Sequence, residues 1–231
     1  HLLEQLQSLI PTALTGSVVR TEGMMTAVAG LPAPVGAFVE IERQAGGPVG
    51  GEVVAFRDEL TLVYPFSSMS GVRRGNRVRL KRTSPFLRVG EALLGRVLDA
   101  HGATKDGLPE PVLPDRVPYD RLGPPAVQRP PIDTPLSTGV RAIDGLLTCG
   151  RGQRLGIFAG AGVGKSVLLG MMARYTAADV NVIAMIGERG REVNEFLDRD
   201  LGPHGLARSV VVVATSDEPA LARVRAAMTA T

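Results

Sequence analysis

Residues 159–166 read Ala-Gly-Ala-Gly-Val-Gly-Lys-Ser, and they stand between an apolar run at 154–159 and a helical apolar pattern at 165–176. Glycines at this density let successive backbone N–H groups turn into one concave loop, where side chains would clash with a bound anion. The N-terminus of the following helix adds partial positive charge. The segment therefore predicts a phosphate-binding turn between a strand and a helix, within an α/β domain that has a parallel sheet.

Two side chains at the end of this turn have the chemistry that a nucleotide requires. Lys165 can reach the β- and γ-phosphates, and the Ser166 hydroxyl can ligate Mg²⁺. Only three of the 26 basic residues are lysines, so a lysine at this position favours binding over the alternative of a glycine-rich turn with a solvated charge. The predicted nucleotide contacts are Gly160, Ala161, Gly162, Val163, Gly164, Lys165, Ser166 and Val167.

A second candidate group follows the apolar run at 180–186, where Gly187, Glu188 and Arg189 stand in sequence. Parallel strands end at the same edge of a sheet, so Glu188 is placed to polarise an attacking water and Arg189 to meet phosphate charge. Two alternatives stay open: a helix-capping cluster of solvated charges, or an acidic residue that coordinates Mg²⁺. Asp217 competes for the latter role but fits it poorly, so we expect that acid beyond residue 231.

The N-terminal part of the chain has a hydrophobic period of two, which is typical of half-buried strands. Six short runs separated by turn residues predict a small closed β-barrel, since closure removes unpaired edges. The six runs are 17–21, 26–29, 37–41, 52–56, 60–64 and 77–80. The predicted domains are a helical segment (1–15), the six-stranded barrel (16–90), a Pro-rich connector (91–135) and a partial P-loop ATPase domain (136–231).

The C-terminal part alternates strands and helices, which indicates a parallel sheet covered on both faces. Strands are predicted at 154–159, 180–186 and 209–214, and helices at 139–147, 165–176, 192–200 and from 218 onward. Three strands make a small sheet for this architecture. We therefore expect the domain to be truncated at the C-terminus, and the sequence, which begins with His1, to be a fragment.

Composition excludes several classes of protein. One cysteine, Cys149, cannot form an internal disulfide, and the three histidines stand too far apart to suggest a metal site. A net charge of +3 is too weak to imply a nucleic-acid partner. A local basic cluster is interpreted as a solvated rim of the barrel rather than a nucleic-acid or lipid contact; it comprises Arg73, Arg74, Arg77, Arg79, Lys81, Arg82 and Arg88.

Long stretches resemble a known family: GRGQRLGIFAGAGVGKSVLLGMMARYTAADVNVIAMIGERGREVNEFL, LGPHGLARSVVVVATSDEPALARVRAAMTAT, LLGRVLDAHGATKDG and RPPIDTPLSTGVRAIDGLLTCGRGQ. They resemble the flagellar protein-export ATPases of the type III secretion ATPase family, which are relatives of the catalytic β-subunit of rotary ATP synthases. The resemblance implies a β-barrel followed by a RecA-like P-loop (Walker A) domain.

The resemblance also implies an activity, namely ATP hydrolysis that energises bacterial type III protein export, most directly flagellar assembly. Glu188 would be the general base, Arg189 a γ-phosphate contact, Lys165 and Ser166 the phosphate and Mg²⁺ residues, and Glu192 the holder of a water in the Mg²⁺ shell. ATP and Mg²⁺ are the implied cofactors. The implied partners are further copies in a homohexameric ring, the flagellar export apparatus with its regulator, stator and stalk proteins, and chaperone–substrate complexes. The implied location is cytoplasmic, peripheral at the inner membrane of the flagellar base.

Four alternatives remain beside the flagellar ATPase. Two are close relatives: a virulence-type secretion ATPase and a catalytic subunit like that of rotary ATP synthases. A non-catalytic ring subunit is disfavoured, because such relatives carry glutamine where Glu188 stands. An RNA-translocating, transcription-termination-type ring would need aromatic side chains to stack bases, and the chain has nine aromatic residues and no tryptophan. We expect the 231-residue fragment alone to be weakly active or inactive.

Overall fold

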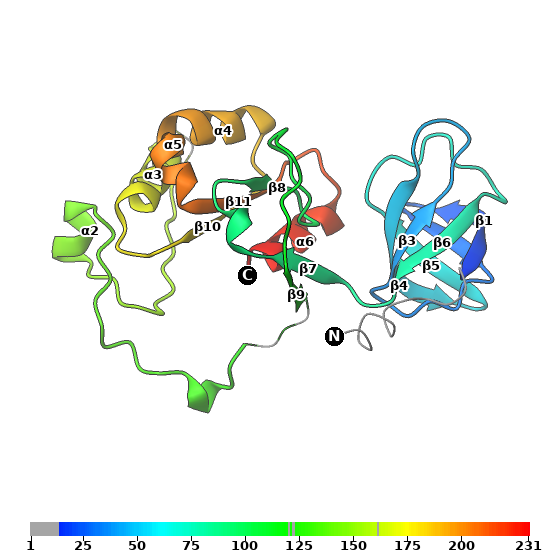
Figure 1. Cartoon of the computed structure of the whole chain (residues 1–231), viewed down its shortest axis with the longest axis horizontal. Coiled ribbons are helices and arrows are strands. Elements are labelled where there is room, and N and C mark those ends of the chain that lie inside the picture. The colour runs from blue at the N-terminus through cyan, green and yellow to red at the C-terminus, as the bar shows by residue number, and fades with distance from the viewer. Residues whose placement is uncertain (1–13, 120, 122, 161) are drawn as a thin grey trace. The chain divides into compact units, whose positions relative to one another are not determined.

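The structure is a computed structural model, and it describes residues 14–119, 121, 123–160 and 162–231. The chain divides into two units, one built mainly on residues up to Phe86 and one mainly on the residues from Leu87 onward. We call them the barrel unit and the sheet unit and describe each by itself (Figure 1). Most of the predicted N-terminal helical segment, residues 1–13, lies outside the described residues.

The barrel unit is a closed barrel in which antiparallel neighbours follow the order β1-β2-β5-β4-β3-β6. Strand β6 pairs with β1 and closes the ring, so no edge stays unpaired. This confirms the predicted six-stranded barrel, and each predicted run is a strand. The strands are β1 (Thr15–Glu22), β2 (Met25–Ala29), β3 (Phe38–Ile41), β4 (Val49–Arg57), β5 (Leu60–Pro65) and β6 (Arg77–Arg82).

Buried apolar and exposed charged residues alternate along β6, and this alternation separates the core of the barrel from its surface. Val78 and Leu80 point inward into an aliphatic cluster, whereas Arg79 and Lys81 point outward. Arg79 pairs with Glu42 at 2.7 Å, and Lys81 pairs with Glu40 at 3.1 Å, across the β3–β6 ladder. Arg79 and Lys81 thus lie on the outer face of the barrel in exposed ion pairs, as a solvated rim requires, whereas Arg88 belongs to the sheet unit and donates to the carbonyl oxygen of Leu113 at 3.2 Å.

The sheet unit contains a three-stranded parallel sheet in the order β10-β11-β8, formed by β10 (Asn181–Ile186), β11 (Ser209–Ala214) and β8 (Val97–Leu98). The predicted strand at 154–159 is wrong, because the backbone there forms no strand and Phe158 is 97% exposed. A strand requires a hydrogen-bonded neighbour as well as apolar residues. The third position is taken by β8, from the segment that the sequence assigned to the connector.

Helices cover both faces of this sheet, as the alternating pattern predicted. Valines of β11 point alternately to the two sides, so Val211 and Val213 meet one layer of helices and Val212 meets the other. The first layer comprises α3 (Lys165–Tyr175), α4 (Gly190–Glu195), η3 (Phe196–Leu201) and α5 (Gly202–Ala207), and the second is α6 (Ala220–Ala230). The predicted helix at 192–200 is therefore divided between α4 and a π-helical segment, η3.

The remaining elements of the sheet unit are short. Strands β7 (Phe86–Val89) and β9 (Asp115–Pro118) form a two-stranded sheet within the predicted barrel edge and connector. Single helical turns are η1 (Glu91–Leu93) and η2 (Ala126–Gln128), and α2 (Arg141–Leu146) falls within the predicted helix at 139–147. Residues 108–112 and the residues on either side of η2 lack regular structure and are mostly exposed, as the prolines predicted.

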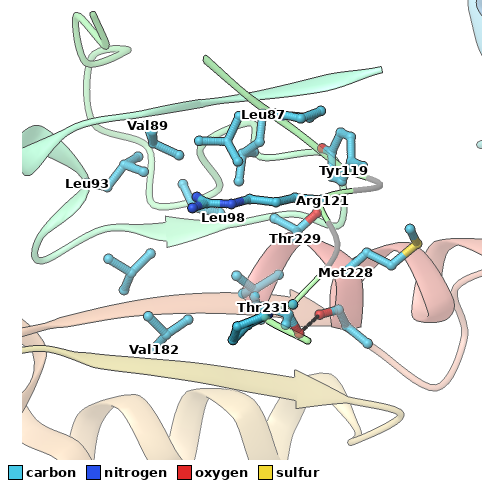
Figure 2. Close-up of a pocket in the computed structure, with 18 residues that line it drawn as sticks. Leu87, Val89, Leu93, Leu98, Tyr119, Arg121, Val182, Met228, Thr229 and Thr231 are labelled. Carbon is cyan, nitrogen blue, oxygen red and sulfur yellow. Dashed lines mark hydrogen bonds between the residues drawn. The ribbon is translucent and has the colours of Figure 1, made fainter. Parts of the chain in front are cut away.

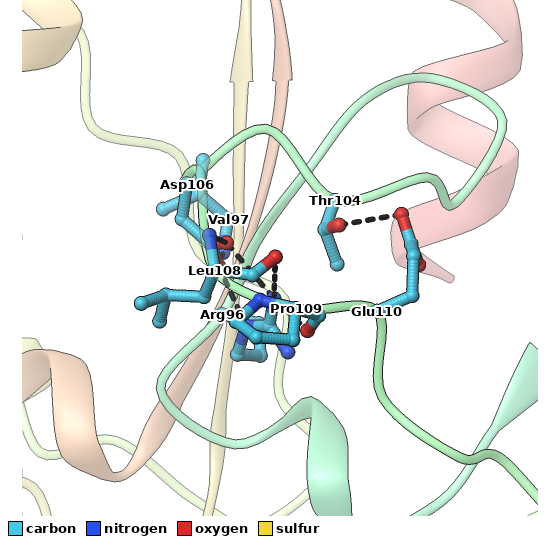
Figure 3. A network of polar contacts seen from close by, with 7 residues as sticks. All are labelled: Arg96, Val97, Thr104, Asp106, Leu108, Pro109 and Glu110. Atoms are coloured by element: carbon cyan, nitrogen blue, oxygen red, sulfur yellow. Dashed lines mark hydrogen bonds and ion pairs between the residues drawn. The ribbon is translucent and has the colours of Figure 1, made fainter.

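A buried ion pair holds the loop that follows β8 (Figure 3). Arg96 donates to Asp106 through Nε at 2.6 Å and Nη2 at 2.9 Å, and the two side chains are only 10% and 12% exposed. Nη2 also donates to the carbonyl oxygens of Leu108 and Pro109. The backbone N–H groups of Val97 and Leu108 donate to the Asp106 carboxylate. Hydrogen bonds from Arg96 hold the pKa of Asp106 well below its usual range.

Asp106→Asn is expected to destabilise the sheet unit by about 3–5 kcal/mol at pH 7, because it leaves the Arg96 charge buried without its counter-ion. Urea denaturation of the full-length protein measures the free energy of unfolding. The folded-state pKa of Asp106 is depressed, so its stabilisation is present above the ordinary value of 3.8 and is lost as pH falls below that value. The difference between wild type and variant should therefore shrink below about pH 4.

Asp115→Asn is the matched control, because Asp115 is an exposed acid on β9 in the same unit. Its effect should stay within about 0.5 kcal/mol at either pH. Two results would contradict a specific role of the Arg96–Asp106 pair. One is an equal loss of unfolding free energy in the two variants. The other is a difference in unfolding free energy between wild type and Asp106→Asn that is the same at pH 7 and pH 3.

Candidate functional site

The glycine-rich turn runs directly into α3, as predicted, whereas the strand that was predicted before the turn does not form. Gly162 and Gly164 have φ values of 77° and 100°, in the left-handed region that glycine adopts without strain. Gly164 is the N-cap residue of α3, and its carbonyl oxygen accepts the first helical hydrogen bond, from Leu168. A methyl group built on Gly160, Gly162 or Gly164 would meet nothing within 4 Å. There is therefore free space beside each of these three glycines.

The structure brings together the two side chains on which the predicted chemistry depends. Lys165 Nζ lies 3.5 Å from Glu188 Oε1, although the two residues come from different elements. The side chains are 43% and 34% exposed, so both are accessible from solvent. Ser166 follows Lys165 in the first turn of α3. The helix with the phosphate turn and the end of β10 therefore meet at one place.

The backbone of Glu188 is tied to the end of the neighbouring strand. The N–H of Gly187 donates to the carbonyl oxygen of Ala214 at 2.8 Å, and the N–H of Ser216 donates to that of Glu188 at 3.0 Å. These bonds extend the β10–β11 ladder past the last strand residues. Glu188 is thus held at the carboxyl edge of the parallel sheet, where ligands of such sheets bind.

Arg189 and Glu192 lie beside Glu188 but are engaged with each other. Arg189 is the N-cap residue of α4, its N–H approaches Glu192 Oε2 at 3.5 Å, and its side chain pairs with Glu192 at 3.6 Å. The Arg189 side chain is 81% exposed. Glu192 thus has the capping position that the sequence left open as an alternative for this group of charges, because it stands three residues after the N-cap.

Asp217, the other acidic candidate, lies beyond β11. A hydrogen bond from the Thr215 side chain lowers the pKa of Asp217, and the charge of Lys105 lowers it further. Lys105 itself pairs with Glu218 at 3.0 Å. Asp217 is therefore stabilised as a carboxylate within this local turn.

Two kinds of feature are absent from the described part of the chain. No three side chains of the types His, Cys, Asp or Glu are grouped so that they could hold a metal ion. No helix among the described residues has both the length and the apolar character that crossing a membrane requires.

A cavity of about 1050 Å³ lies elsewhere in the sheet unit (Figure 2). Its walls are largely apolar and come from β7, β8, β9, β10, β11 and the end of α6. Leu98, Val182 and Met228 line it, and Arg121 extends into it. None of the predicted site residues lines this cavity. It is therefore separate from the phosphate turn.

The residues at the turn fit a nucleotide phosphate with its magnesium ion. The space beside the three glycines is open to a ligand, and Lys165 supplies a positive charge there. The Ser166 hydroxyl at the start of α3 is the ligand type that Mg²⁺ accepts beside phosphate oxygens. Ala161, another predicted contact, lies outside the described residues.

Comparison with known proteins gives consistent results for the two units. The sequence model of the ATP synthase alpha/beta family, nucleotide-binding domain, matches residues 139–231. The chain is 47% identical over 220 residues to the flagellum-specific ATP synthase of Bacillus subtilis (strain 168), which covers 94% of this chain and 50% of that protein. It is 48% identical over 217 residues to the type 3 secretion system ATPase of Xanthomonas euvesicatoria, covering 94% and 49%.

A solved structure agrees with both the fold and the sequence relationship. The ATPase EscN of the enteropathogenic E. coli type III secretion system, in complex with its central stalk EscO, superposes with a TM-score of 0.86 at 44% identity. The match covers 93% of this chain and 52% of EscN. The chain spans about half the length of the relatives that it matches. Residues 139–231 therefore match the nucleotide-binding domain of the ATP synthase alpha/beta family, and the chain is similar over most of its length to flagellum-specific and type III secretion ATPases.

Proposed function

We propose that the full-length protein hydrolyses ATP to energise type III protein export, most directly in flagellar assembly. The observation that carries this proposal is the 3.5 Å approach of Lys165 to Glu188 beside an open glycine turn. Such a pair combines a phosphate-binding cation with a carboxylate that can accept a proton. Hydrolysis needs both groups at one place, whereas binding alone needs only the first.

Each residue of the site has a defined role in this proposal. The glycine turn, Val163 and Val167 surround the phosphates, and Lys165 binds the β- and γ-phosphate oxygens. The Ser166 hydroxyl holds Mg²⁺, which when bound offsets phosphate charge. Glu188 accepts the proton of the attacking water.

Arg189 and Glu192 have less direct roles. In the proposal, Arg189 turns from Glu192 toward the γ-phosphate, and Glu192 then orients a water at the metal. Their present pairing is weak and solvent-exposed, at 3.6 Å, so it costs little to break.

The proposed partners follow from the relatives. EscN has been solved in assembled form and together with a central stalk protein. We propose that this protein likewise assembles with copies of itself, as a homohexameric ring, and binds a stalk protein of its own export apparatus. Its proposed place is the cytoplasmic side of that apparatus.

The test is steady-state ATP hydrolysis by the full-length protein, followed by export of flagellar proteins in cells in which it replaces the resident ATPase. ATP hydrolysis with restored export supports the proposal, and restored virulence-type export in place of flagellar export would assign it to the other branch. RNA-dependent hydrolysis would favour the translocase alternative. Binding of ATP with no hydrolysis under any condition would identify a non-catalytic ring subunit.

A further inference from the structure

Helix α3 and the π-helical segment η3 approach each other more closely than side chains normally allow. The contact point on α3 is Gly170, which is buried. A methyl group built on Gly170 would stand 2.5 Å from the carbonyl oxygen of Asp200, 2.7 Å from its carbonyl carbon and 2.9 Å from its Cβ. Ordinary contacts begin at about 3.4 Å. Only glycine fits here while the two backbones keep this separation.

The partner of Gly170 in this contact is the backbone of Asp200, which lies in the π-helical segment η3. Each π-helical hydrogen bond spans five residues, and the N–H of Gly202 closes this segment on the carbonyl oxygen of Leu197. Asp200 is buried in the widened turn, and its carbonyl oxygen accepts a hydrogen bond from Arg174 of α3. One carbonyl group thus receives both the close approach of Gly170 and the guanidinium of Arg174.

Gly170 and Arg174 lie in the C-terminal half of α3, which is distant from the phosphate turn. The Asn181 side chain donates to the carbonyl oxygen of Ala173 at 2.8 Å, which ties the same half to the start of β10. Ala173 and Leu201 share one apolar cluster with Met185 of β10. The first turn of α3, with Lys165, is more exposed. The position of Lys165 therefore depends on how the second half of α3 is seated.

The segment against which α3 is seated continues directly from Glu188. Helix α4 begins at Gly190 and runs without interruption into η3. Figure 1 shows α3, α4 and α5 together on one side of β10. The backbone of Glu188 is itself bonded to the end of β11, as described above. The two sides of the phosphate site are therefore joined by the packing of α3 against η3, in which Gly170 and Asp200 make a close backbone contact.

We propose that Gly170 and Arg174 are positioning residues, which set the distance between Lys165 and Glu188 through their contact with Asp200. The proposal rests on the function proposed above. Gly170 stands five residues after Lys165, about 7.5 Å along the helix, so a shift at one is transmitted to the other by a rigid α-helix. A side chain at Gly170 must push α3 and η3 apart by roughly 1 Å, and displacements of that size cost up to ~10²-fold in rate.

The experiment compares Gly170→Ala with wild type in the full-length protein. We expect kcat for ATP to fall roughly 10- to 100-fold, because the carboxylate and the phosphate-binding cation no longer meet in their productive geometry. The dissociation constant for ATP should change less than about threefold, because the turn, Lys165 and Ser166 move together on one helix. Both are measured on protein whose folded fraction is determined by thermal unfolding.

Gly145→Ala is the matched control, since Gly145 is also a helical glycine and a methyl group there meets nothing within 4 Å. It should hydrolyse ATP at the wild-type rate. Arg174→Gln provides a second test that adds no bulk: it removes the hydrogen bond to Asp200 and should lower kcat several-fold, again with ATP affinity retained. This variant decides the question if Gly170→Ala does not fold.

Two results would overturn the positioning role. One is a lowered melting temperature with wild-type kcat per folded molecule, which would mean that the contact serves packing alone. The other is a loss of ATP affinity as large as the loss of kcat. Wild-type protein that binds ATP without hydrolysing it would instead refute the proposed function, so the two failures are distinguishable.

Discussion

Glu188→Gln is expected to lower kcat for ATP hydrolysis by roughly 10²–10⁴-fold, the usual contribution of a general base. The amide keeps the size and hydrogen bonding of the carboxylate but is a far poorer proton acceptor. ATP affinity should not fall, because the substitution also removes the negative charge that lies 3.5 Å from Lys165 in the present structure. Steady-state kinetics and equilibrium binding of ATP, on the same full-length preparation, separate the two effects.

The control is Glu195→Gln, which removes a nearby carboxylate that pairs with Arg191 on the exposed side of α4. Its turnover should stay within about twofold of wild type, since an exposed pair of this kind contributes little. The opposite result for Glu188→Gln would be weaker ATP binding with a wild-type kcat at saturating ATP. In that case Glu188 has a structural role, and its assignment as the general base is wrong.

Lys165→Ala is expected to weaken ATP binding by about 100-fold or more. The phosphates lose a charge-assisted contact of about 1.5–3 kcal/mol, and the Glu188 carboxylate is left beside them without its counter-ion. Isothermal titration of ATP into the full-length protein measures this directly. Hydrolysis should fall to background, because binding and charge stabilisation are lost together.

Lys105→Ala tests whether this effect is local. Lys105 is in the same unit and also pairs with a glutamate, Glu218, at 3.0 Å, so its removal changes the net charge equally. ATP affinity should remain that of wild type in this variant. If Lys165→Ala binds ATP with an affinity within twofold of wild type, residues 159–167 do not form the phosphate site.

The helix and the strand that carry the candidate site residues were predictable, because consecutive residues indicate each of them. Glycines before Lys165 and Ser166 predicted the turn and the helix that follows it, and the apolar run before Glu188 predicted β10. Both elements formed at the predicted places. The 3.5 Å distance between Lys165 and Glu188 was not predictable, because it depends on how α3 is seated against η3. The glycine at 170 gave no local signal, since its partner Asp200 is thirty residues away.

The amino-acid sequence by itself determined those strands and helices in which buried and exposed residues recur with a regular period. Alternation along runs such as β6 marks an inner and an outer face, and this period sufficed for all six barrel strands. Tertiary structure alone decided which apolar segments pair. The run at 154–159 has strand composition but forms no strand, whereas Val97–Leu98, two residues in the predicted connector, complete the sheet. Val97 and Leu98 pair with Val211 and Val212 of β11, which follow more than a hundred residues later, and local periodicity carries no information about such distant partners.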